Sequence, residues 1–68
     1  MNYKQIEKVV KDRELPLIGE TGDGDPMIIS KGMNGGKCYY KLEVPQDNGW
    51  VRHLYYYEDG TSEELFEQ

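Results

Sequence analysis

Apolar residues recur at a helical spacing near the start of the chain. One narrow stripe, with members three or four residues apart, consists of Tyr3, Ile6, Val9 and Val10. Such a stripe predicts an amphipathic helix, and Asn2 before it can cap the first turn. Pro16 ends the pattern, because the residue before a proline avoids the helical region. We therefore predict a helix over residues 2–14, which must pack on another element because it is too short to be stable alone.

The rest of the chain consists of short apolar runs separated by turn-forming residues. A buried connection is predicted over residues 15–18, and a loop over residues 19–26, where glycine, proline and acidic residues are concentrated. Four strands are predicted, over residues 27–31, 38–44, 50–57 and 62–67. Short connections favour antiparallel neighbours. The predicted fold is therefore one α+β domain, residues 1–68, with an N-terminal helix packed on a four-stranded antiparallel β-meander.

The turns decide which side chains share a face of this sheet. Asp59-Gly60 is typical of a two-residue hairpin turn, which would place Leu54 opposite Leu65. With an even-numbered loop before residue 50, one face holds Cys38, Tyr40, Leu42, Val44, Val51, Tyr55, Tyr57 and Phe66. We expect the helix to cover that face. An odd-numbered loop would exchange the assignment, because a one-residue slip moves every side chain to the other side.

The opposite face is more apolar than a solvated sheet face should be. Its aromatic and aliphatic members are interleaved with the charged residues Lys41, Glu43, Arg52, Glu63 and Glu67. Large apolar groups rimmed by both signs of charge are typical of protein interfaces. The predicted partner-binding residues are Tyr39, Trp50, Arg52, Leu54, Tyr56 and Leu65, with Trp50 and Tyr56 as anchors. An ordinary solvated face is the alternative, since tyrosine is common on half-exposed strands.

Composition narrows the classes of function. The net charge of −5 disfavours direct binding to nucleic acid, which depends on Lys and Arg to neutralise phosphates. A chain with one cysteine forms no internal disulfide, which fits a reducing cytoplasm. No apolar run is long enough to span a membrane. Because so small a domain is marginally stable, we expect either a second copy or another protein as its partner.

Acidic residues near the C-terminus support a second hypothesis. Five of them form a cluster in the sequence: Glu58, Asp59, Glu63, Glu64 and Glu67. Such a patch could mimic nucleic acid and occupy a basic cleft of a partner protein, which would make this chain an inhibitor or regulator. The same charges would also protect an exposed edge strand against aggregation.

Catalytic and metal-binding chemistry has little support in the sequence. Glu20, Asp23 and Asp25 offer oxygen ligands, but their spacing does not match a calcium-binding loop. Cys38 and His53 could lie on adjacent strands and share a face, yet no residue is identified that would orient the histidine or supply an oxyanion hole. We therefore expect no enzymatic activity, no cofactor and no metal.

Overall fold

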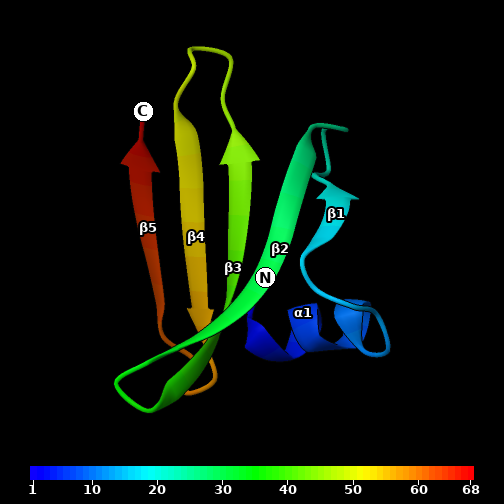
Figure 1. Ribbon diagram of the computed structural model, residues 1–68, viewed down its shortest axis with the longest axis vertical. Coiled ribbons are helices and arrows are strands. Elements are labelled where there is room, and N and C mark those ends of the chain that lie inside the picture. The colour runs from blue at the N-terminus through cyan, green and yellow to red at the C-terminus, as the bar shows by residue number, and fades with distance from the viewer.

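Five antiparallel strands form one sheet in the computed structural model, which describes residues 1–68, and a short helix lies against one end of that sheet (Figure 1). The helix is α1 (Tyr3–Val10), and the strands are β1 (Leu17–Glu20), β2 (Pro26–Asn34), β3 (Lys37–Pro45), β4 (Val51–Tyr57) and β5 (Ser62–Glu67). Strands that are consecutive in the chain are also neighbours in the sheet. The predicted α+β class and antiparallel meander are confirmed, whereas the predicted number of four strands is wrong.

The additional strand is β1, in a segment for which the sequence predicted a buried connection and a loop. Leu17 pairs with Ile29, and the chain turns back through residues 21–25. Thr21 organises this turn, because its N–H donates to the Asp25 carbonyl at 2.8 Å and its hydroxyl oxygen accepts from the Asp25 N–H at 3.2 Å. The glycines and acids that indicated a loop therefore connect two paired strands.

The helix begins where the sequence predicts but ends earlier. The Asn2 side-chain oxygen accepts a hydrogen bond from the Gln5 N–H at 3.0 Å, which caps the first turn. The last helical residue is Val10, because residues 11–14 are all charged and offer no apolar group to the sheet. Ile6 and Val10 are the buried residues of α1, so these two side chains hold it in place.

The core lies between α1 and one face of the sheet, which we call the helix face. A row of directly opposed residues crosses four strands on this face: Leu17, Ile29, Leu42 and Leu54. The buried cluster consists of Ile6, Val10, Ile29, Tyr40 and Leu42, with Tyr3, Leu15, Leu17, Met27, Leu54 and Tyr56 packed against it. Leu54 and Tyr56 therefore lie on the helix face, and their predicted position on the opposite face is wrong.

The loop between β3 and β4 explains the exchange of faces. Pro45 pairs with Val51, which leaves residues 46–50 in the loop, an odd number. The Gln46 N–H donates to the Trp50 carbonyl at 2.8 Å and closes this loop. The predicted even-numbered loop is wrong, and the side chains of β4 point to the sides opposite to those predicted.

The turn between β4 and β5 also differs from the prediction. It has three residues, 58–60, with Gly60 at a φ of 92°, a left-handed conformation that favours glycine. Leu54 consequently lies opposite Glu64. The predicted two-residue turn, and the pairing of Leu54 with Leu65 that followed from it, are wrong.

Asp59 stabilises this three-residue turn. Its carboxylate accepts from the Thr61 N–H at 2.9 Å and the Thr61 hydroxyl at 2.6 Å, and from the Lys37 ammonium at 3.0 Å. The Thr61 hydroxyl and N–H, followed by Lys37, hold the pKa of Asp59 well below its usual range. The same hydrogen bond to Asp59 raises the pKa of Lys37.

We expect Asp59→Asn to lower the stability of the folded state at neutral pH. The folded-state pKa of Asp59 is below its unfolded value, so the charged carboxylate stabilises the fold above about pH 4 and loses that effect as the pH falls toward the folded-state pKa. Urea unfolding midpoints of both proteins between pH 7 and pH 2 should therefore converge on the acid side. A difference that stays constant over this range would contradict the role given to the carboxylate charge.

Candidate functional site on the open face

The sheet face opposite α1 is not covered by the helix, and we call it the open face. The end of β2, with Met33 and Asn34, reaches toward β5 on this side and borders one pocket with Glu63 and Leu65. The side chains of the open face are Ile18, Ile28, Tyr39, Lys41, Glu43, His53, Tyr55, Tyr57, Glu63, Leu65 and Glu67 together with the smaller residues between them. Several apolar side chains remain in contact with solvent, because Ile18 is 77% exposed, Leu65 48% and Ile28 39%. A solvated face of an antiparallel sheet is normally polar, so this amount of apolar surface requires an explanation.

Three tyrosines form an aromatic group on the open face. The Tyr39 ring meets Tyr55 at 5.3 Å and Tyr57 at 5.6 Å between centroids, in both cases edge to face, a favourable arrangement for aromatic pairs. Around them lies a shallow pocket of 400 Å³, which we call the tyrosine depression and which is lined by Met33, Asn34, Tyr39, Tyr55, Tyr57, Glu63 and Leu65. Tyr57 is buried, whereas Met33 and Leu65 are 66% and 48% exposed and offer accessible apolar surface at the sides of the depression.

Gly32 allows the Tyr39 ring to lie across β2. The two residues are directly opposite one another in the sheet, and a Cβ added at Gly32 would lie 2.6 Å from the Tyr39 Cζ. That distance is shorter than any non-bonded contact between carbon atoms. The absence of a side chain at Gly32 is therefore required for the observed position of Tyr39.

Two lysines lie over the tyrosine rings. The Lys41 ammonium is 5.4 Å from the Tyr55 centroid, and the Lys37 ammonium is 5.5 Å from the Tyr57 centroid, within the range of cation–π attraction. Burial acts to lower the pKa of Lys41, but the Tyr55 phenol and the Glu43 carboxylate outweigh it, and the pKa is raised. Both lysines are thus charged and already engaged by groups of the same face.

His53 is the buried polar residue of the open face. It is 8% exposed, its Nδ1 has no hydrogen-bond partner, and its Nε2 lies 3.8 Å from the Glu67 carboxylate. His53 lies opposite Glu43 and shares its face. Because Cys38 is five positions before Glu43 along β3, its side chain points to the other face, which is the helix face. Cys38 and His53 therefore lie on adjacent strands but do not share a face, and the two side chains form no nucleophile–base pair.

The structure separates the six residues that were predicted to bind a partner. Tyr39 and Leu65 lie on the open face. Three others lie on the helix face: Arg52, Leu54 and Tyr56. Trp50 lies in the loop before β4 and is 36% exposed. The predicted aromatic face therefore exists in part, with Tyr55 and Tyr57 in the places that the sequence assigned to Leu54 and Tyr56.

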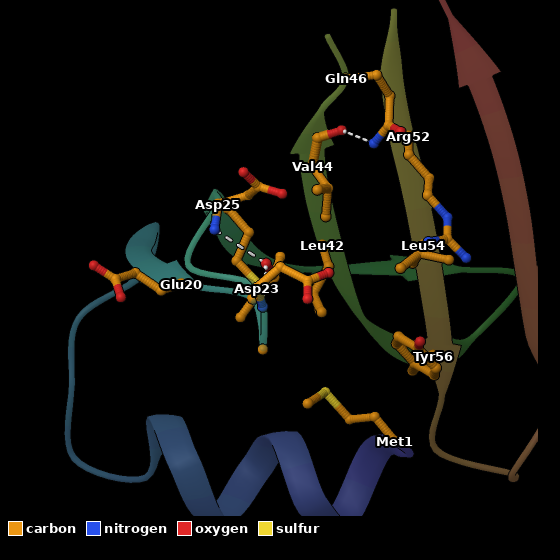
Figure 2. A pocket seen from close by; sticks show the side chains of 13 residues that line it. Met1, Glu20, Asp23, Asp25, Leu42, Val44, Gln46, Arg52, Leu54 and Tyr56 are labelled. Atoms are coloured by element: carbon orange, nitrogen blue, oxygen red, sulfur yellow. Dashed lines mark hydrogen bonds between the residues drawn. The ribbon is translucent and has the colours of Figure 1, made fainter.

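The helix face contains a second pocket, of 380 Å³, beside the turn between β1 and β2 (Figure 2). Its apolar lining comes mainly from Leu42, Val44, Leu54 and Tyr56. Glu20, Asp23 and Asp25 line the other side, and Figure 2 shows their carboxylates pointing in different directions. No three His, Cys, Asp or Glu side chains are grouped where they could hold a metal ion.

The predicted acidic patch is divided between surfaces. Glu63 and Glu67 lie on the open face and Glu64 on the helix face, while the other two residues, Glu58 and Asp59, lie in the turn. Two of the five are paired with cations: Asp59 with Lys37 at 3.0 Å and Glu64 with Arg52 at 2.6 Å. The cluster is thus less concentrated in space, and less negative, than it is in the sequence.

Comparisons with known proteins identify no relative of this chain. No family model, no curated protein and no solved structure matches it. Its helix is not long and apolar enough to cross a membrane. The geometry and charge of the open face are therefore the basis for a proposed function.

Proposed function

We propose that this protein is a small interaction module that binds another protein through the open face of its sheet. The observation that supports the proposal is the exposed apolar surface of Ile18, Ile28 and Leu65, together with the tyrosine depression, on a face that the helix does not cover. Tyrosines at the centre and charged groups at the rim are the composition of a binding surface. Tyrosine also offers a large contact area with little rotamer entropy to lose.

The size of the face agrees with this role. The molecule measures 33 by 25 Å along its two longer axes, so one broad face offers about 800 Å², which is what each partner contributes to a standard protein interface. The whole chain exposes 4937 Å². A partner on the open face would therefore cover roughly a sixth of the surface. Its contacts would stabilise a domain whose own core is small.

Charge favours a different protein over a second copy. Glu63 and Glu67 have no lysine or arginine partner, whereas Lys41 is paired with Glu43 at 3.6 Å. Two open faces that meet with β5 over β5 would bring these carboxylates together in a partly desolvated interface, where like charges cost roughly several kcal/mol. A partner that presents lysines or arginines around an apolar centre would complement the face.

Leu65→Ser is expected to weaken binding to a partner recovered with the wild-type protein by roughly tenfold, or about 1.4 kcal/mol. Leu65 is 48% exposed, so the substitution should leave the fold intact. Val9→Ser is the matched control, because Val9 is 57% exposed but lies on α1. Equal affinities of the two variants, measured by calorimetry, would contradict the use of the open face. A wild-type dimer that Leu65→Ser dissociates, detected by light scattering, would identify a second copy as the occupant instead.

A further inference from the structure

The outer edge of β5 is free. In the strand order β1-β2-β3-β4-β5 it pairs with β4 alone, and Figure 1 shows no element on its other side. All six of its residues are exposed. The Tyr57 N–H donates to the Thr61 carbonyl, so Thr61 and every second residue after it point their backbone groups toward β4. The backbone groups of Ser62, Glu64 and Phe66 therefore point toward solvent.

This edge lacks most features that prevent strand addition. Edge strands are usually protected by charged side chains, above all lysine, by proline, by a bulge or by short length, and of these β5 has only the charge of its glutamates. β5 has six residues in continuous register with β4, and its sequence, Ser-Glu-Glu-Leu-Phe-Glu, contains neither proline nor lysine. Leu65 and Phe66 are 48% and 51% exposed, one on each side of the sheet. An added strand would therefore gain backbone hydrogen bonds and an apolar neighbour on both faces.

The glutamates of β5 select against a second copy of the same edge. When two β5 strands pair antiparallel about a twofold axis, directly opposite residues have their side chains on the same face. The helix faces of the two copies therefore lie on one side only if the two residue numbers of each pair add up to an even number. The two registers with the longest overlap, of five residues each, place Glu63 opposite Glu67 or Glu64 opposite Glu64. Like charges directly opposite are destabilising, whereas lysine or arginine at those positions would be favourable.

We infer that β5 takes up an extended, basic segment of a partner protein as a sixth strand, a mode of recognition that rests on the proposed function and identifies the partner's chemistry. An antiparallel segment Lys-Val-Val-Arg-Lys-Thr would place its residues in turn opposite Glu67, Phe66, Leu65, Glu64, Glu63 and Ser62. Main-chain hydrogen bonds supply affinity in such complexes, and alternate side chains supply specificity. Both Arg52 donors to Glu64 use Oε2, which leaves Oε1 for the arginine of the segment.

The experiment is an NMR titration of the full chain with this hexapeptide, acetylated and amidated. The largest amide shifts are expected at Ser62, Glu64 and Phe66, whose N–H groups would gain a partner. A peptide N-methylated at its arginine, which faces β5, should bind at least tenfold more weakly. N-methylation of its third residue, whose N–H points away from β5, is the matched control and should have less effect. A peptide with glutamate in place of its three basic residues should cause no shifts.

Two results would overturn the inference. The first is an absence of shifts at β5 with millimolar peptide, and the second is equal weakening by the two N-methylated peptides. Shifts confined to the tyrosine depression, with β5 unaffected, would reject strand addition while leaving the open face as the binding surface. The proposed function is tested with the recovered partner and not with this peptide, so a failed titration would reject strand addition and leave the comparison of Leu65→Ser with Val9→Ser to be judged by itself. The N-methylated peptides also leave the protein unchanged, so no misfolded variant can confuse the result.

Discussion

Leu42→Ala is expected to remove about 2–5 kcal/mol of unfolding free energy, which is most of the stability that a domain of this size has. Leu42 is 3% exposed and lies in the row between Ile29 and Leu54. It also belongs to the cluster that holds α1 on the sheet. The substitution would therefore leave a cavity at the junction of the helix and three strands, where the neighbouring side chains cannot all move in to fill it.

Urea unfolding followed by circular dichroism measures this effect. Ile18→Ala is the control, because Ile18 is 77% exposed on the open face, and a substitution there should change stability by about 0.5 kcal/mol or less. A loss below about 1 kcal/mol for Leu42→Ala would show that the core does not lie under α1. The comparison thus tests which face of the sheet is the inside of the molecule.

The sequence was sufficient to predict the elements whose signals are local. The apolar stripe and Asn2 locate the start of α1, and the turn residues locate four of the five strands. β1 was not predicted, because it has only four residues (Leu17–Glu20) between Pro16 and a loop rich in glycine. Its identity as a strand depends on pairing with β2, which no local pattern contains.

The faces of the sheet were harder to predict, because they depend on whether each of the two turns that flank β4 has an odd or an even number of residues. Asp59-Gly60 fits both a two-residue and a three-residue turn. The decision involves Lys37, which reaches the Asp59 carboxylate from 22 positions away in the sequence. Between residues 51 and 57, apolar and aromatic residues occupy both alternating sets, so hydrophobicity alone cannot tell the inside from the outside.

These limits explain which part of the candidate site was predicted. Tyr39 and Leu65 were placed on the binding face, where the structure also has them, whereas Tyr55 and Tyr57 were assigned to the core. The loop before β4 and the turn after it were both predicted to have an even number of residues, and both have an odd number. Each error exchanges the faces of everything after it, so the two errors cancel for Leu65 in β5, whereas only the first affects the residues of β4. The prediction of an aromatic, uncovered face was therefore sounder than the identities of its central residues.

Gly32→Ala is expected to destabilise the protein by about 1–3 kcal/mol, although alanine is normally favoured over glycine in a strand by about 0.5–1 kcal/mol. The reason is the Tyr39 ring, because the new Cβ would lie 2.6 Å from its Cζ. The ring must leave its place, and it then loses its edge contacts with Tyr55 and Tyr57. The tyrosine depression would lose one wall, so partner binding should weaken as well.

A double-mutant cycle with Tyr39→Ala separates this cause from a general effect of the substitution. Once the ring is absent, Gly32→Ala should be neutral or stabilising, and the two changes should differ from additivity by about 1 kcal/mol or more. Unfolding midpoints of the four proteins in urea give the coupling. Additive effects would mean that Tyr39 does not lie on Gly32, and the open face would then have a different shape from the one proposed to bind a partner. Strong coupling would show that a residue with no side chain fixes the position of an aromatic group in the binding surface.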